Sequence, residues 1–449
     1  MKILFLDVYK KSHSRISKDT AGGYGTENDM GDGLFGSSLS RLIKKSIFWP
    51  NLSFIQTLEE FKAKGYKCEY RKQLGSNIHF KEKWDAVFVC SSIVCFETEL
   101  EACNQIKNKY NIPVFLCGSI GQFIKNKIPE KITLITGNYE FLAQRLESTG
   151  ESIRDISKKD IINVIHGRPE DLKIIDWSLK SLRETKNFIL GNRKYFFPYI
   201  TTRGCPYSCF EYCTYPLAQG RKILQEPVDS VVKKLKIISE KYPNSHTVFR
   251  DPVFSINMKH TKSLLQKIGD ENLSMDFSAE LHLKNVDDEF IELCKHAKIT
   301  GLKFGIESAH EEVRDSVNRF SIDNDEQLKT VNKINNANIR TVGMFILAQP
   351  TDDRDSCLST IDYACSLGLS IAQFSIFTPY PGTPFYNKSK DILSFKKYEE
   401  CNQYNLTFKH ESISKKEARE LLEKAYFNFI ISKVKKRYFK FSPLSLFVK

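Results

Sequence analysis

The chain has 449 residues, so at least two domains are expected, because a single hydrophobic core stops growing at roughly 250–300 residues. Its 41% hydrophobic and 27% charged residues exclude a disordered or fibrous protein. The net charge of +13 comes from scattered lysines without an RNA-binding motif, and a nucleic-acid partner is therefore not expected.

The start of the chain, MKILFLDVYKK, is too short an apolar run for a secretory leader and reads as a first strand. The sequence contains no run of about 18 consecutive apolar residues, which is the length needed to cross a bilayer. We therefore expect a cytoplasmic protein whose twelve cysteines stay reduced, where clustered thiols usually bind metals or serve catalysis.

Residues 1–145 alternate short apolar runs with amphipathic helical patterns over 39–65 and 97–110. The apolar runs predict strands at 2–8, 66–70, 84–92, 112–119 and 132–137. This alternation predicts an open, doubly wound α/β domain of flavodoxin-like (Rossmann-type) architecture, in which ligands bind at the carboxyl ends of the strands.

Residues 146–195 show no long strand pattern and are expected to form a linker. Residues 196–386 then alternate six apolar runs with helical patterns, which predicts a partial (β/α)6 barrel of TIM-like type. The predicted strands are 199–204, 246–255, 275–281, 301–308, 341–349 and 371–380.

Residues 387–449 are expected to be helical and are rich in basic residues. Their aromatic residues alternate with lysine and arginine and include Tyr426, Phe427, Phe429, Tyr438 and Phe439. Packing of this aromatic stripe on the barrel is the favoured interpretation; peripheral membrane contact or a lipid substrate is the alternative.

Three cysteines, Cys205, Cys209 and Cys213, lie four positions apart directly after the first strand predicted for the barrel. Three thiolates from one loop match a 4Fe-4S cluster with one iron left open. A closed zinc site would prefer a fourth protein ligand, and none lies beside the trio. Three buried structural cysteines are the other alternative.

The segment 195–216, YFFPYITTRGCPYSCFEYCTYP, resembles the cluster loop of the radical S-adenosylmethionine (SAM) superfamily, in the branch with an N-terminal cobalamin-binding domain. That family usually has spacings of three and then two residues, whereas this chain has three and three. Phe210 or Glu211 is the extra residue, and Tyr212 keeps the aromatic position before the last cysteine.

Segments after the cysteine loop also resemble the radical SAM superfamily, and this resemblance extends to about residue 386. Asp251 is at the acidic position after the second strand, and Glu307 with Ser308 ends a segment similar to the family's GIES strand. Ala348 stands where members usually have glycine, and 377–386, FTPYPGTPFY, closely resembles the exit of the sixth strand. The resemblance implies that Tyr212 shields the cluster and that Asp251, Glu280, Glu307 and Ser308 bind SAM.

The first domain resembles the family's cobalamin-binding domain in segments 84–92, 112–123 and 132–142. The resemblance implies a cleft of small residues for a flat corrin, with Glu140 kept from the family's acidic turn. The candidate cleft residues are Ser91, Ser92, Gly118, Ser119 and Gly137. No DxHxxG motif occurs, so a histidine ligand to cobalt is not expected.

The resemblance implies a cobalamin-dependent radical SAM methyltransferase acting on an unactivated carbon of a small-molecule, lipid or natural-product substrate. Its cofactors would be a 4Fe-4S cluster, SAM and cobalamin, and its partner an external one-electron reductant of flavodoxin or ferredoxin type. Two alternatives stay open: a radical SAM enzyme for cyclisation, rearrangement or epimerisation, and an inactive cofactor-binding scaffold.

Overall fold

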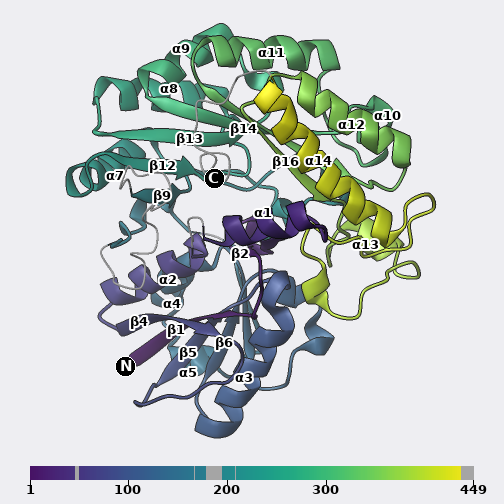
Figure 1. Cartoon of the computed structure of the whole chain (residues 1–449). Helices are drawn as coiled ribbons and strands as arrows, with labels where there is room; N and C mark the ends of the chain where they lie inside the picture. The colour runs from purple at the N-terminus through teal and green to yellow at the C-terminus, as the bar shows by residue number, and fades with distance from the viewer. Residues whose placement is uncertain (46–49, 166, 178–194, 208, 436–449) are drawn as a thin grey trace.

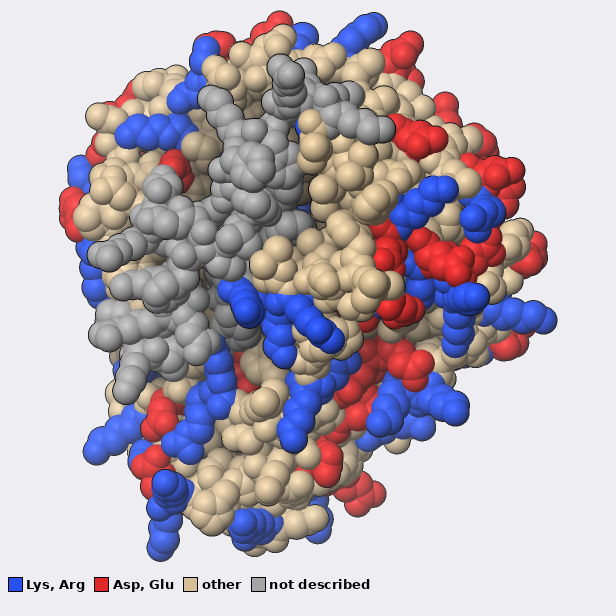
Figure 2. Space-filling view, viewed as in Figure 1, with Lys and Arg blue, Asp and Glu red and all other residues tan. Residues whose placement is uncertain are grey.

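The structure, a computed structural model, contains two parallel sheets, each covered by helices, with the chain passing once from the first to the second (Figure 1). The residues that it describes are 1–45, 50–165, 167–177, 195–207 and 209–435. Among these residues, no helix combines the length and the apolar character that crossing a membrane requires. On the face shown in Figure 2, basic and acidic side chains are interspersed, as the scattered lysines of the sequence predict.

The first sheet has six parallel strands in the order β4-β1-β5-β6-β7-β8. Its first five strands in chain order are arranged 2-1-3-4-5, which is the flavodoxin-like order, so the fold class predicted for this domain is confirmed. The strands are β1 (Lys2–Tyr9), β4 (Lys67–Leu74), β5 (Ala86–Cys90), β6 (Val114–Cys117), β7 (Thr133–Gly137) and β8 (Ile161–Val164). The helices are α1 (Leu34–Lys44), α2 (Leu52–Ala63), α3 (Phe96–Tyr110), α4 (Leu142–Thr149) and α5 (Ile153–Ile156).

The edge strand β8 lies in the segment 146–195 that the sequence pattern assigns to a linker. It pairs in parallel with β7, so the first domain continues past residue 145. The strand is only four residues long and alternates exposed and buried positions, as expected at a sheet edge. Four alternating residues are too few for a strand to be recognised from the periodicity of the sequence.

The second sheet also has six parallel strands, which follow one another across the sheet in chain order. It curls into a partial barrel whose edges, β9 and β16, do not pair; this confirms the predicted partial barrel. The strands are β9 (Phe196–Tyr199), β12 (Ser245–Phe249), β13 (Met275–Leu281), β14 (Ile299–Glu307), β15 (Arg340–Leu347) and β16 (Ile371–Ile376). The main helices are α7 (Val228–Lys241), α8 (Met258–Asp270), α9 (Asp288–His296), α11 (Asn324–Asn336) and α12 (Arg354–Ser366).

The first barrel strand lies earlier than the segment 199–204 predicted for it. Residues 200–204 leave the sheet, and β10 (Thr202–Arg203) forms a small ribbon with β11 (Leu224–Gln225). Three short helices complete the domain: α6 (Tyr215–Gln219), α10 (Glu311–Ser316) and α13 (Pro384–Lys388).

The C-terminal region is less helical than expected over 387–449, because residues 389–414 form loops with one short 3-10 turn. The helix α14 (Lys415–Lys435) then packs on the open side of the barrel (Figure 1). The Tyr426 hydroxyl donates to the carbonyl of Phe374 on β16, and the Phe429 ring lies 6.5 Å from the Phe374 ring. Barrel packing therefore uses both aromatics, whereas Phe427 is 47% exposed. Tyr438 and Phe439 lie outside the described residues.

Residues 10–33, which we call the strap, join β1 to α1 and were not predicted to be structured. They form the hairpin β2 (Arg15–Ser17) and β3 (Thr26–Asn28) and reach across to the second domain. Arg419 of α14 pairs with Asp29 at 3.0 Å, and the backbone N–H of Gly33 donates to Glu423 at 2.7 Å. The strap is thus fixed to the last described helix.

Candidate functional site

The cysteine loop begins where the chain leaves the second sheet. Gly204 has φ +84°, and a Cβ at this position would lie 2.1 Å from the carbonyl oxygen of Lys222, so only glycine fits. Cys205 and Cys209 are buried and Cys213 is half-buried. A hydrogen bond from the Cys213 thiol lowers the pKa of Cys209 to about 6, which favours the thiolate that an iron ligand must be.

Arg319 lies against this loop and was not identified from the sequence. Its Nη1 atom lies 3.9 Å from Cys209 Sγ, and its Nε lies 3.4 Å from a carboxylate oxygen of Glu307. Its Nη2 donates to the carbonyl of Gly305 at 3.0 Å. A buried guanidinium here stabilises negative charge on the sulfur ligands. Twelve residues separate Arg319 from Glu307, so no local pattern could indicate that they meet.

The three thiols suit a multi-iron cluster better than a single ion. Among the described residues, no group of three or more His, Cys, Asp or Glu side chains is placed to hold one metal ion. A 4Fe-4S cluster makes a different demand, because each cysteine binds a separate iron. Three thiols on one loop, with a cation beside Cys209, are a fitting donor set for such a cluster, although burial raises the pKa of Cys205 and the hydrogen bond to Cys209 raises the pKa of Cys213.

A cavity of about 210 Å³ adjoins Cys213 at the carboxyl ends of the barrel strands, and the strap covers it. Three of the predicted SAM-site residues, Tyr212, Glu280 and Glu307, line it. Glu307 has φ +70°, a strained backbone conformation of the kind that often marks a functional site. Burial raises the pKa of Glu307 to about 7. The cavity thus presents carboxyl groups beside the cluster loop.

The structure brings Glu280 to the cavity on β13, with Lys303 Nζ 3.6 Å from its carboxylate. Asp251 and Ser308 lie elsewhere. Asp251 accepts hydrogen bonds from the backbone N–H of Thr201, at 2.7 Å, and from its hydroxyl. Burial raises the pKa of Asp251 to about 6. Asp251 therefore braces the segment that enters the cysteine loop.

Ser308 is fully buried and faces the helix layer. Its hydroxyl lies 3.2 Å from that of Thr360 on α12 and accepts from the backbone N–H of His310 at 3.1 Å. The Ser308 carbonyl accepts from Arg314 at 2.7 Å. These contacts join β14 to α12 and explain why Ser308 does not line the cavity.

A second cleft lies between the two domains, at the carboxyl ends of the first sheet. Gly118, Ser119, Gly137 and Glu140 line it from the first domain, and α6 lines it from the second. Its volume is about 40 Å³, and the Ser119 hydroxyl donates to the carbonyl of Ala218 across it at 3.3 Å.

The remaining residues predicted to bind cobalamin lie behind this cleft. The Ser92 hydroxyl and backbone N–H both donate to Glu99 at 2.8 Å. The Ser91 hydroxyl is buried without a hydrogen-bond partner, but Ser91 does not line the cleft. Gly118 has φ +151°, and a Cβ there would lie 2.8 Å from the carbonyl oxygen of Ser91.

The small residues that line the cleft, Gly118, Ser119 and Gly137, fit a cobalamin chemically. The cleft volume does not admit a corrin as it stands, because ligand pockets are typically about 300–1,000 Å³. Binding requires α6 to move away from Ser119. The residues fit the cofactor on condition that the cleft opens.

Three comparisons with known proteins agree with this architecture. Residues 199–364 match the family model of the radical SAM superfamily. The chain is 26% identical over 234 residues to an uncharacterized methyltransferase of Pyrococcus horikoshii, covering 52% of this chain and 50% of that protein. It is 25% identical over 241 residues to the bacteriochlorophyllide d C-12(1)-methyltransferase of Chlorobaculum tepidum, with the same coverage. The chain thus spans about half the length of the curated relatives it matches.

Among solved structures, the chain resembles the radical SAM methyltransferase TsrM of Kitasatospora setae, solved with cobalamin and a 4Fe-4S cluster bound. The TM-score is 0.59 at 14% identity, covering 87% of this chain and 74% of that one. At this identity the likeness shows a shared fold, and it extends over both domains.

Proposed function

We propose that the chain is a cobalamin-dependent radical SAM methyltransferase that acts on an unactivated carbon of a small-molecule, lipid or natural-product substrate, because residues 199–364 match the family model of the radical SAM superfamily. One observation carries the proposal. Cys213 of the cysteine loop lines a buried cavity, and a second cleft with small residues lies beside it between the domains.

The cavity and the cleft share two side chains, Tyr215 and Arg250. Groups bound in the two sites would therefore be neighbours, as methyl transfer to a substrate radical requires. When bound, the cluster with SAM supplies a 5'-deoxyadenosyl radical, and cobalamin supplies the methyl group.

The residues of the chain would bind and orient the cofactors and protect the radical intermediate. The three cysteines would hold the cluster, and Arg319 would balance its charge. Glu280 and Glu307 would bind the amino or ribose groups of SAM, and the half-buried Tyr212 would shield the cluster from water. Protection matters because a radical intermediate is quenched by stray hydrogen donors. An external one-electron reductant of flavodoxin or ferredoxin type would be the partner.

A second function, radical chemistry without methyl transfer, is favoured by one observation. The cobalamin cleft is narrow, and the Glu140 carboxylate within it is already paired with Arg203. A chain that never binds a corrin would still have the cluster loop and the cavity beside it.

Anaerobic purification with iron, sulfide and cobalamin, followed by reductive turnover with SAM, tests both functions. We expect bound iron, bound cobalamin and 5'-deoxyadenosine, with a methylated product once the substrate is present. Deoxyadenosine formation without bound cobalamin would support the second function. An iron-free protein would contradict both.

A further inference from the structure

A mainly apolar cavity of about 80 Å³ lies between the barrel and α14, and the site described above does not use it. Its walls come from the strap, α1, β15, β16 and α14, and most of them are buried. The apolar residues that form them include Met30, Ile43, Val342, Ala372, Phe429 and Ile430. Such an apolar wall suits a hydrocarbon surface, and because the cavity is smaller than the roughly 300–1,000 Å³ of ordinary ligand pockets, it takes only part of a long chain as it stands.

This cavity is continuous with the cavity beside Cys213. Arg15, Asn28, Lys303 and Gln373 line both, so they stand at the junction between them. Lys303 contacts Glu280 at 3.6 Å, so two cations and one carboxylate meet at this point. Burial lowers the pKa of Arg15 to about 10 and also lowers that of Lys303, which means that the charged forms of both would gain from an added anion.

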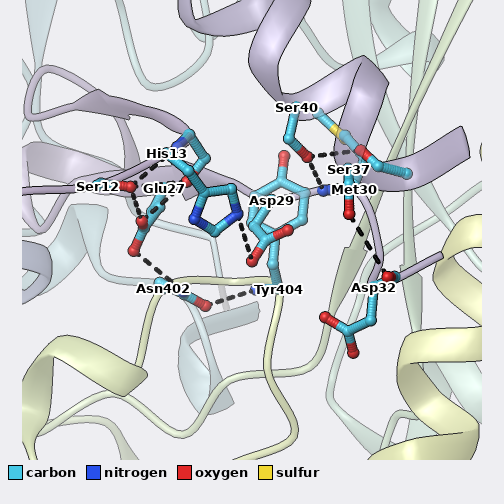
Figure 3. Close-up of polar contacts among 12 residues, drawn as sticks. Ser12, His13, Glu27, Asp29, Met30, Asp32, Ser37, Ser40, Asn402 and Tyr404 are labelled. Atoms are coloured by element: carbon cyan, nitrogen blue, oxygen red, sulfur yellow. Dashed lines mark hydrogen bonds and ion pairs between the residues drawn. The ribbon is translucent and has the colours of Figure 1, made fainter. Parts of the chain in front are cut away.

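The junction is held in place by the strap. The Asn28 side chain donates to the Tyr404 hydroxyl at 2.8 Å, and the Met30 backbone N–H donates to the Ser40 hydroxyl at 2.8 Å. Figure 3 shows Met30, Ser40 and Tyr404 together with the contact of Glu27 to Asn402 across the same interface. A wall fixed on both sides is already organised for binding, which reduces the ordering cost that a ligand must overcome.

We propose that the apolar cavity binds the hydrocarbon next to the acid group of the substrate and that Arg15 and Lys303 bind that single carboxylate. The inference rests on the proposed function, because it takes the cavity beside Cys213 as the reaction site. The acid group would lie at the junction, and only the cavity beside Cys213 reaches the cluster loop. The reacting carbon is therefore one close to the carboxylate.

Calorimetric titration of the full chain with decanoate tests the inference, with decanol and decyltrimethylammonium as uncharged and cationic probes. We expect decanoate to bind at least tenfold more tightly than either. Lys303→Met should weaken decanoate binding about tenfold and leave decanol unchanged. Lys333→Met, which removes an exposed cation on α11, is the matched control and should change neither.

Ile430→Trp tests where the probe lies. Ile430 is half-buried at the cavity wall, so a larger side chain can be placed there without overfilling the core. We expect Ile430→Trp to weaken the binding of decanoate and the binding of decanol alike, by tenfold or more. Equal binding of all three probes, or binding unaffected by Ile430→Trp, would overturn the inference.

The titration needs no cluster and no SAM, so its outcome is separate from that of the turnover experiment. A chain that forms deoxyadenosine but binds decanoate and decanol equally would overturn this inference alone. Selective binding of decanoate by a chain that cannot be loaded with iron would overturn the proposed function alone.

Discussion

Glu140 of the first domain and Arg203 of the second form a buried ion pair, and Arg203 lies two residues before Cys205. Their side chains are 2% and 5% exposed. The guanidinium also lies over the Phe141 ring, 5.3 Å from its centroid. This pair joins the predicted cobalamin domain directly to the cluster loop.

We expect Glu140→Gln to destabilise the protein by about 3–5 kcal/mol, because it leaves the Arg203 charge buried without its carboxylate. Urea unfolding measures the change. The control is Glu147→Gln, which breaks a pair with Lys64 whose side chains are 65% and 37% exposed. In the control variant the free energy of unfolding should fall by at most about 1 kcal/mol. Equal losses in the two variants would show that burial does not strengthen the Glu140 pair.

Cys213→Ala is expected to abolish deoxyadenosine formation and to lower the bound iron, because a cluster held by two thiols loses one of its iron contacts. Tyr212→Phe should keep most of the activity, since the ring that shields the cluster remains. Cys68→Ala, on β4 of the first sheet, is the control and should retain the iron content of the parent. Unchanged turnover in the Cys213 variant would show that the third ligand is another residue.

Glu99 should make stability depend on pH. Burial raises its pKa from 4.5 to about 7, although Lys18 lies 2.7 Å away and opposes the shift. The folded state therefore binds more protons than the unfolded state between these values. This contribution to stability is fully present below about pH 4.5 and is lost as the pH rises through 7. The shift corresponds to about 3 kcal/mol.

Urea unfolding of Glu99→Gln and of the parent at pH 5 and pH 8 measures this contribution. The stability of the parent relative to the variant should fall by about 2.5 kcal/mol between the two pH values, because part of the contribution is already lost at pH 5. Glu101→Gln, on the exposed face of the same helix, is the control and should show no such change. A constant difference between parent and Glu99→Gln would contradict the prediction.

Cobalamin binding should depend on the cleft at α6. Ala218 lines this cleft and is 5% exposed, so Ala218→Leu adds bulk where the corrin must enter. We expect bound cobalamin, measured by absorbance, to fall at least tenfold. The iron content should stay that of the parent, because the cysteines are unchanged. Full cobalamin binding in this variant would place the corrin elsewhere.

The sequence predicted the two parallel sheets because buried parallel strands are near-continuous apolar runs. β13, Met275–Leu281, begins and ends where its pattern indicates. The strap was missed because β2 and β3 have three residues each, too few for any periodicity. Its structure depends on contacts with α14, which lies about 390 residues further along the chain.

Residues of the candidate site could be predicted where a motif within one segment of the sequence identifies them. The cysteine spacing and Glu307 lead from the sequence to the cavity. The contacts of Ser308 and Asp251 could not be predicted, because both depend on which neighbour packs beside the strand end. Arg319 was missed for the same reason: its role comes from tertiary contact with Cys209.

The attachment of the strap to α14 has a consequence for biosynthesis. Arg419 and Glu423 hold residues that leave the ribosome near the very beginning of translation. The strap gains these two contacts only after the last described helix has been made. During synthesis the cysteine loop is thus translated before the strap can be joined to α14.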